Sequence, residues 1–263
     1  IALSAHGQSY PAKPIRYIVP FPAGGGQDLV VRALAPRLTE ALGQPIVVDN
    51  RPGAATMVGA ELAAKSPPDG YTVFNGSNTT LSINPNLYTK VPYDPIRDFM
   101  PVTQIASVPN LLIVHPSLPA KSVKELAALA RSRPNQINYA SSGIGTPAQL
   151  AGVMFGDAAN AKLVHVPYRG TSLALTAVIS GESQIMFSSM AAALPFVKSG
   201  RMRAIAVTGA KRSLAAPDVP TVAETFPGFE AITWYGLFVP AGTPAASCGA
   251  TSRRKTSRAP NSC

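Results

Sequence analysis

Four loops combine glycine with hydroxyl or amide side chains, and each follows a short apolar run that is typical of a strand. Glycines let a ligand approach backbone N–H groups, and the start of a following helix attracts negative charge. This combination of residues favours the binding of an anion. The loops, in chain order, are Phe21–Asp28, Asn75–Thr80, Ser141–Thr146 and Tyr168–Thr171.

The first loop contains three successive glycines, Gly24 to Gly26, followed by Gln27 and Asp28. An anion site at the start of a helix is one interpretation, and a tight turn capped by Asp28 is the other. The spacing is not G-x-G-x-x-G, and no G-x-x-x-x-G-K-[ST] occurs in the chain. A nucleotide ligand is therefore not favoured.

The loop from Ser141 to Thr146 leads into Pro147, and Thr followed by Pro is typical of a helix N-cap and first helical residue. Capping explains these two residues but not the Ser-Ser-Gly-x-Gly run before them, so we expect that run to serve a ligand. In the fourth loop, Arg169 is the only cation of the four loops and a candidate partner for a carboxylate. A solvated surface arginine is the alternative interpretation.

Residues typical of catalysis do not form a recognisable constellation. His6, His115 and His165 are isolated, and neither H-E-x-x-H nor G-x-S-x-G occurs. His165 interrupts an apolar strand, where a hydrogen-bonded structural role is commoner than metal ligation. We therefore expect no metal, no cofactor and no enzyme activity; an enzyme that uses Ser142 or Tyr168 is the alternative.

The composition indicates a compact globular protein, because apolar residues make up 46% of the chain and charged residues 14%. The net charge of +10 first suggests an acidic partner. Outside the last sixteen residues, however, the cations are scattered, and no stripe of Lys and Arg alternates with aromatic side chains. Such a stripe is typical of single-strand and RNA binding. We therefore expect no nucleic-acid partner.

Alternating strands and helices must position the loops, and the spacing of apolar residues predicts such elements along most of the chain. This alternation is typical of the α/β class with mostly parallel sheets, in which ligands bind beyond the carboxyl ends of the strands. Pro36 should kink or end the first helix. Strands are expected at 15–19, 46–48, 71–74, 111–114, 137–140, 163–166, 184–187 and 202–207, and helices at 30–41, 57–65, 123–131, 147–156, 171–180 and 189–199.

The alternation pauses in a stretch rich in Pro and Asn, Asn84–Pro101, which suggests two lobes. A final apolar run, Ile232–Val239, would return the chain to the first lobe, as a two-lobed binding protein with a hinge requires. We expect lobe one to comprise residues 10–106 and 234–246, and lobe two to comprise residues 107–233.

Both ends of the sequence are atypical. Residues 1–9 resemble the end of a signal peptide with a small-x-small cleavage site, Ala5-His6-Gly7, which predicts a periplasmic protein; a flexible N-terminus is the alternative. Residues 247–263 lack apolar periodicity and contain both cysteines and four cations. A frame shift near Ala246 or a disordered basic tail would explain this composition.

Seven segments occur in order between about Tyr10 and Pro244: Pro14–Asp28, Val48–Ala54, Ser66–Tyr71, Tyr93–Phe99, Val166–Gly170, Ala204–Thr208 and Pro240–Pro244. As an ordered set they closely resemble the Bug family, the periplasmic receptors of tripartite tricarboxylate transporters. The resemblance implies a periplasmic-binding-protein fold, in which two α/β lobes around a hinge close on a small organic acid. It also implies that the glycine loop, Phe21–Asp28, and the Ser141–Thr146 loop hold the carboxylate, partly through ordered water.

The resemblance further implies an extracytoplasmic, monomeric receptor that delivers a di- or tricarboxylate, an aromatic acid or an acidic amino acid to membrane transporter subunits. A ligand-sensing module that docks on a membrane sensor is a further alternative. Gln27 stands where relatives commonly carry a small hydroxyl residue and Gln149 where many carry His, so the far end of the ligand is expected to differ. The candidate ligand-binding residues are Phe21, Ala23, Gly24, Gly25, Gly26, Gln27, Asp28, Asn78, Thr79, Ser141, Ser142, Gly143, Thr146, Gln149, Tyr168, Arg169 and Ser188.

Overall fold

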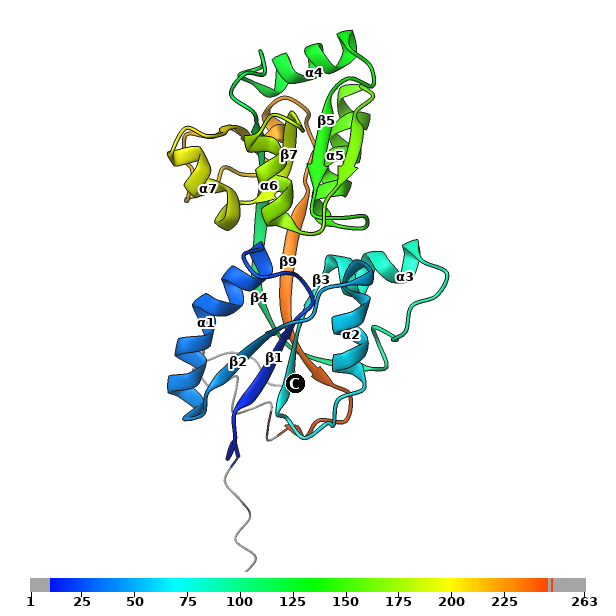
Figure 1. Cartoon of the computed structure of the whole chain (residues 1–263), viewed down its shortest axis with the longest axis vertical. Coiled ribbons are helices and arrows are strands. Elements are labelled where there is room, and N and C mark those ends of the chain that lie inside the picture. The colour runs from blue at the N-terminus through cyan, green and yellow to red at the C-terminus, as the bar shows by residue number, and fades with distance from the viewer. Residues whose placement is uncertain (1–9, 246, 248–263) are drawn as a thin grey trace, which may run out of the picture.

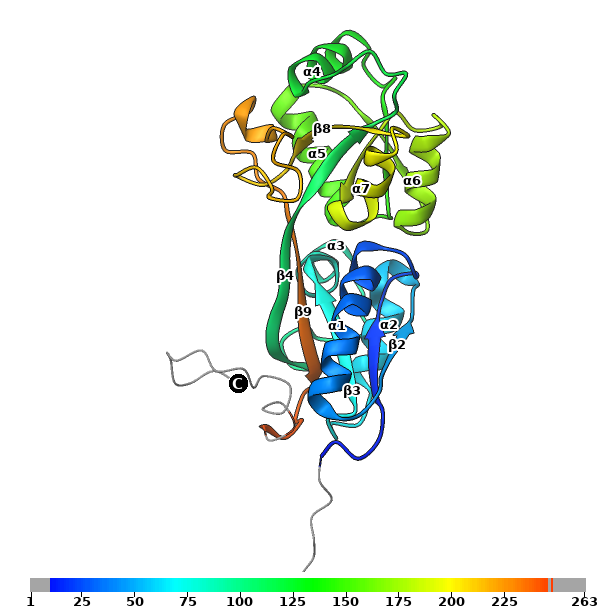
Figure 2. The same ribbon diagram turned by 90° about the vertical axis from the view of Figure 1, so that its left-hand side faces the viewer.

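The computed structural model of the chain describes residues 10–245 and residue 247. Two α/β lobes lie one above the other along the long axis, and two long strands, β4 (Phe99–Val114) and β9 (Ile232–Pro240), join them (Figure 1). These strands run side by side between the lobes (Figure 2). The expected signal-peptide remnant at residues 1–9 lies outside the described residues, and so does the expected atypical tail apart from Ser247.

Lobe one is built on a sheet in the order β2-β1-β3-β9-β4. Strand β1 is parallel to β2 and β3, whereas β9 is antiparallel to β3 and β4. The remaining elements of lobe one are β1 (Ile15–Val19), α1 (Gly26–Leu42), β2 (Ile46–Asn50), the 3₁₀ turn η1 (Ala54–Thr56), α2 (Met57–Ala64), β3 (Thr72–Ser77), the π-helical turn η2 (Asn78–Ile83) and α3 (Asn84–Leu87).

Successive residues of β1 point to opposite faces of this sheet, as the two-residue period of a strand requires. Tyr17 and Val19 share a buried cluster with Val31 of α1. Ile18 belongs to a second cluster together with Ala60 of α2. All five residues are fully buried, so a helix covers each face of the sheet.

Lobe two is built on a sheet in the order β8-β4-β7-β5-β6. Strand β5 is parallel to β6 and β7, and β4 is antiparallel to β7 and β8. The remaining elements of lobe two are α4 (Val123–Ser132), β5 (Asn138–Ser141), α5 (Pro147–Ala159), β6 (Val164–Pro167), α6 (Thr171–Ile179), β7 (Ile185–Ser189), α7 (Met190–Lys198), β8 (Arg203–Val207) and the 3₁₀ turn η3 (Val222–Glu224).

The core of lobe two is also divided by its sheet. Leu112 of β4 lies in a buried cluster with Leu126 of α4 and Phe155 of α5. Its neighbour Leu111 lies in another cluster with Val178 of α6. Each lobe therefore has the helix–sheet–helix layering of an α/β domain.

Strand β4 belongs to both sheets and differs most from the expectation. Residues 99–109 pair with β9, and residues 110–114 pair with β7, so the strand passes from one sheet to the other between Pro109 and Asn110. A strand was expected only from Leu111, because prolines are rare in central strands. Two register shifts in the β4–β9 ladder, one of them next to Pro101, accommodate this sequence.

Two further expectations differ from the structure. Because β4 and β9 form antiparallel ladders, the sheets are mixed rather than mostly parallel. Helix α1 continues through Pro36, so the helix does not end at this proline. The division into residues 10–106 with 234–246 and residues 107–233 stays a prediction.

Candidate functional site

Two adjoining cavities lie between the lobes, one of about 720 Å³ and one of about 50 Å³. Phe21, Thr79 and Ser142 line both cavities. Residues of lobe one and lobe two face each other across each cavity, where strands lead into helices. A cleft between lobes is where an open α/β sheet places its ligand.

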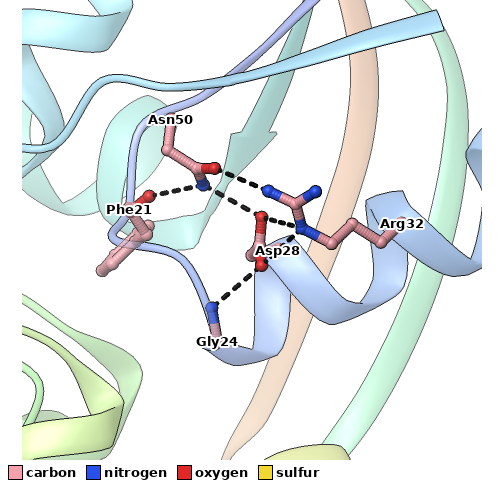
Figure 3. Close-up of polar contacts among 5 residues, drawn as sticks. All are labelled: Phe21, Gly24, Asp28, Arg32 and Asn50. Carbon is pink, nitrogen blue, oxygen red and sulfur yellow. Dashed lines mark hydrogen bonds and ion pairs between the residues drawn. The ribbon is translucent and has the colours of Figure 1, made fainter.

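Asp28 of α1 holds the glycine loop in place through hydrogen bonds (Figure 3). The Asp28 carboxylate accepts hydrogen bonds from the Gly24 N–H at 2.9 Å, from Arg32 Nε at 2.9 Å and from Asn50 Nδ2 at 3.0 Å. Asn50 Nδ2 also donates to the Phe21 carbonyl at 3.0 Å. Asp28 therefore fixes the loop and does not line either cavity.

The charge of Asp28 matters for this arrangement. Burial disfavours the ionised carboxylate, but the hydrogen bonds from Arg32, the Gly24 N–H and Asn50 hold the pKa of Asp28 below its usual value. The carboxylate is therefore ionised at neutral pH, as three donors require.

The second loop, between β5 and α5, is fixed by its own polar side chains. Thr146 Oγ1 donates to the Gly143 carbonyl at 2.7 Å and accepts from the Gln149 N–H at 3.4 Å. Ser141 Oγ lies 3.0 Å from the Gly143 carbonyl oxygen, and the Gly145 N–H donates to Gln149 Oε1 at 2.6 Å. Ser141 and Gln149 thus hold the loop, while Ser142, Gly143 and Thr146 line the cleft.

The larger cavity is mainly apolar, with prolines from both lobes and alanines from lobe one. Tyr168 and Arg169 were expected at the cleft and line this cavity. Tyr88 and the segment Pro52–Thr56 were not expected there. Ala54, Ala55 and Thr56 of that segment have φ angles of 44°, 52° and 78°, a left-handed conformation that non-glycine residues rarely adopt. Such strain is not visible in the sequence.

The smaller cavity is polar on several sides. Gly25, Gly26, Gln27 and Ser188 were expected in the site and line this cavity. Six polar residues that line it were not among the candidate ligand-binding residues, although Ser77 and Thr171 belong to two of the four loops: Ser77, Asn110, Thr171, Ser189, Thr233 and Tyr235. Most of them lie within strands or at strand ends, where a polar side chain gives no sequence signal of its own.

Four buried polar atoms at the smaller cavity have no hydrogen-bond partner among the described residues: Ser77 Oγ, Thr79 Oγ1, Asn110 Nδ2 and Ser189 Oγ. Buried polar atoms in proteins are nearly always paired, so such a concentration needs an explanation. Tyr235 adds a fifth donor, because burial raises the pKa of its hydroxyl, which therefore stays protonated. Each of the four unpartnered groups can thus donate a hydrogen bond that no described residue accepts.

The charge of the cleft is weakly positive. Among the residues that line the two cavities there is no Asp or Glu, and Arg169 is the one cation. Arg169 is exposed and forms no ion pair with any described residue. An anionic ligand would therefore meet no repulsion from a lining carboxylate.

Six of the expected site residues do not line either cavity. Asp28, Ser141 and Gln149 hold loops, as described above. Asn78 holds β9, because it donates to the Ile232 carbonyl at 3.2 Å and accepts from the Trp234 N–H at 2.9 Å. The other two that do not line a cavity are Ala23 and Gly24.

The part of the chain that the structure describes holds no group of three or more His, Cys, Asp or Glu side chains suited to a metal ion. None of its helices combines the length and apolar character needed to cross a membrane.

Residues 30–263 match the family model described as tripartite tricarboxylate transporter family receptor. The chain belongs to this receptor family. Its relatives include the UPF0065 protein in the tcbD-tcbE intergenic region of Pseudomonas sp. strain P51, 39% identical over 90% of this chain and 70% of the relative. Protein BugT of Bordetella pertussis is 36% identical over 92% of this chain and 75% of its own length. The family resemblance of the seven segments is confirmed.

Solved structures of the receptor family have the same fold. R. palustris Rpa4515 with adipate has a TM-score of 0.90 at 36% identity, over 92% of this chain and 81% of that one. MatC from Rhodopseudomonas palustris with bound malate has a TM-score of 0.85 at 31% identity, over 92% and 83%. The periplasmic binding protein BugD has a TM-score of 0.86 at 33% identity, over 92% and 81%. The expected periplasmic-binding-protein fold is confirmed.

In this receptor, glycines of each lobe lie against side chains of the other lobe. A Cβ atom on Gly26 of α1 would lie 2.5 Å from Ser189 Oγ and 3.1 Å from Tyr235 Oη. A Cβ atom on Gly170 would lie 3.0 Å from Pro22 Cγ. Only glycine allows the lobes to approach so closely at these points.

We predict that Gly26→Ala forces the lobes apart, because the new methyl group overlaps Ser189. Small-angle X-ray scattering should show a larger radius of gyration than for the unsubstituted chain. Gly25→Ala is the matched control, since the nearest atom to its Cβ would be the Pro22 carbonyl oxygen at 3.4 Å, an ordinary contact. An unchanged radius of gyration for Gly26→Ala would contradict the prediction.

Proposed function

We propose that this chain is a periplasmic solute-binding receptor that captures a small organic carboxylate between its lobes and delivers it to the membrane subunits of a tripartite tricarboxylate transporter. The observation that carries the proposal is the group of unpartnered polar atoms at the smaller cavity. A carboxylate supplies oxygen acceptors for these donors in a volume that a larger group would not enter.

Asn110 makes this argument specific. Its Oδ1 accepts from Thr233 Oγ1 at 3.3 Å, so its Nδ2 is the free end of the amide and can only donate. Leaving a buried donor unpaired costs about 1–3 kcal/mol, and a hydrogen bond to a charged group is stronger than one to a neutral group. An occupant with anionic oxygens therefore gains more from Asn110 than a neutral ligand would.

The larger cavity fits the body of the ligand. Its apolar lining favours a hydrocarbon chain or ring, and Arg169 at its edge favours a second acidic group. Adipate and malate, which relatives hold, are both dicarboxylates with such a body between two acids. The ligand class proposed is a di- or tricarboxylate, an aromatic acid or an acidic amino acid.

The proposal includes no catalysis. Tyr168, one of the two residues considered for an enzyme, donates its hydroxyl to Glu182 Oε1 at 2.8 Å and lies 3.3 Å from Ser183 Oγ. Ser142, the other, has no hydrogen bond to a histidine or carboxylate among the described residues. A serine nucleophile needs a neighbouring base, so this cleft favours binding without turnover.

We further propose export to the periplasm with removal of a signal peptide, and a monomeric state. The family match and the periplasmic binding proteins among the solved relatives support the location.

A thermal-shift panel tests the function. Mono-, di- and tricarboxylates, aromatic acids and acidic amino acids are added separately, and the solutions are then examined by NMR for new products. A ligand at 100 times its Kd should stabilise the protein by about 2.7 kcal/mol and raise its melting temperature without being consumed. Conversion of a stabilising acid into a product would overturn the proposed receptor function. A panel in which no acid stabilises the protein would overturn the proposal of carboxylate binding.

Thr79→Val should weaken carboxylate binding without destabilising the protein. Valine has the same shape but removes the buried Oγ1 that has no partner, so the free protein should keep or gain stability by about 1 kcal/mol. The affinity should fall roughly tenfold, as expected for one hydrogen bond to a charged group. Calorimetric titration and chemical denaturation measure the two effects.

Thr80→Val is the matched control for that variant. Thr80 is fully buried, but its Oγ1 lies 3.0 Å from Thr56 Oγ1 and lines neither cavity. Its loss should lower stability by about 1 kcal/mol and leave affinity unchanged. Equal affinities of the Thr79 variant and the unsubstituted chain would exclude Thr79 from the site.

Arg169→Ala should weaken the binding of a dicarboxylate about tenfold and leave the fold intact, because Arg169 is exposed and lines the larger cavity. Arg133→Ala removes the same charge from an exposed position that lines neither cavity and should have no effect. Titration calorimetry with each variant decides, and an unchanged affinity for Arg169→Ala would remove this residue from the proposed site.

A further inference from the structure

His165 on β6 lies outside both cavities, yet it is tied to the loop that lines them. Its Nε2 lies 2.6 Å from Ser141 Oγ, and its Nδ1 lies 3.4 Å from Gln149 Nε2. The ring is half-buried and stacks on Tyr139 of β5, with ring centroids 4.9 Å apart. One imidazole therefore contacts the first residue of the loop and the side chain that holds Gly145.

The hydrogen-bond pattern fixes the tautomer of His165. The Gly145 N–H can only donate, so the Gln149 atom 2.6 Å from it must be the amide oxygen. The amide NH₂ then faces His165 Nδ1 and also can only donate. Nδ1 is therefore an acceptor, and the single ring proton of the neutral imidazole lies on Nε2.

This tautomer determines how the loop is held. The Nε2–H group of His165 donates to Ser141 Oγ, which leaves the Ser141 proton for the Gly143 carbonyl at 3.0 Å. Gly143 has a φ angle of 136°, a backbone conformation that favours glycine. Hydrogen bonds thus lead from Gly145 through Gln149 and His165 to Ser141, and this network begins and ends in the same loop.

A proton on Nδ1 breaks this network. The imidazolium would place an N–H donor against the Gln149 NH₂, which is also a donor. Rotating the amide by half a turn would satisfy Nδ1–H but would turn the NH₂ toward the Gly145 N–H. Gln149 cannot satisfy both neighbours at once, so protonation of His165 weakens the hydrogen bond that holds Gly145.

We propose that His165 is a positioning residue whose neutral imidazole, acting through Gln149 and Ser141, keeps the Ser141–Thr146 loop in its ligand-binding conformation. This inference rests on the proposed function, because it takes that loop as part of the carboxylate site. It makes ligand affinity depend on pH through a group that does not touch the ligand.

The surroundings of His165 support the neutral form. The titratable group that packs on it from β5 is Tyr139, whose own pKa is raised by burial, and from α5 it meets the uncharged Gln149. No charged side chain among the described residues forms a hydrogen bond or an ion pair with the imidazole. Burial lowers the pKa of His165 below its usual value, so the loop is intact at neutral pH.

The sign of the pH effect follows from the proton count. Binding requires the neutral imidazole, so affinity is complete above the pKa of His165 and falls as the pH drops below it. Each pH unit below that pKa should raise Kd about tenfold, because only the neutral fraction binds.

The first experiment needs no ligand. Long-range ¹H–¹⁵N spectra of the labelled full chain report the His165 tautomer, and His165→Gln assigns the signal among the three histidines. We expect the Nε2–H tautomer at pH 8, and a Gly145 amide resonance that titrates with the same midpoint as His165. The Nδ1–H tautomer, or a Gly145 amide that does not respond at that midpoint, would overturn the proposal.

The second experiment measures the Kd of adipate by calorimetry on both sides of that midpoint. Glutamine at position 165 carries an amide NH₂ that can donate to Ser141 but does not titrate, so His165→Gln should show the pH dependence of the acid alone, whatever its absolute affinity. The unsubstituted chain should lose about tenfold more affinity per pH unit below the midpoint than this variant. Identical pH profiles would overturn the proposal.

Gln149→Glu tests the coupling directly. A carboxylate accepts from the Gly145 N–H and from a protonated His165 at once, so the steep fall of adipate affinity at acid pH should disappear even if the added charge lowers affinity throughout. A fall as steep as in the unsubstituted chain would overturn the role of Gln149. Failure of every acid to bind at any pH would remove the proposed function, whereas the ligand-free spectra would still decide the role of His165.

Discussion

The crossing of β4 from one sheet to the other positions three polar residues that line the smaller cavity, Asn110, Ser189 and Thr233. Asn110 is the first residue of β4 to pair in lobe two, opposite Ser189, and Pro109 is opposite Ile232 of β9. Backbone hydrogen bonds therefore hold Asn110 and Ser189 in the same place, and Thr233 is tied to Asn110 through its hydroxyl. Unlike the loops, these residues cannot rearrange without breaking sheet pairing. The unpaired groups of Asn110 and Ser189 therefore gain partners only from an occupant of the cavity.

The glycine loop and the Ser141–Thr146 loop depend on two groups with opposite protonation requirements. Asp28 must be ionised to accept three hydrogen bonds from the glycine loop and its neighbours, and its pKa is held below the usual value. On our proposal His165 must be neutral, and burial lowers its pKa. Both conditions are met at neutral pH, and on our proposal protonation of His165 in acid would release the second loop.

Much of the fold was predictable because short apolar strands alternate with helical patterns from Ile15 to Val207. The crossing strand was not, since Pro101, Pro109 and their polar neighbours are typical of a loop, and only pairing with β9 and two register shifts make them a strand. The loops of the candidate site were also predictable from glycines and hydroxyls. Their members divide in the structure into residues that line the cleft, such as Ser142, and residues that hold it, such as Gln149.

The sequence by itself determined the family, the α/β class and the loops at the ends of the strands, because these follow from local periodicity and from segments that keep their order. Only the tertiary structure decided which polar groups meet. Ser77, Asn110 and Ser189 come from three different strands, and His165 reaches a loop that ends nineteen residues before it. Whether a buried polar atom is paired or free depends on neighbours that sequence spacing does not specify, and in this receptor that difference defines the cleft.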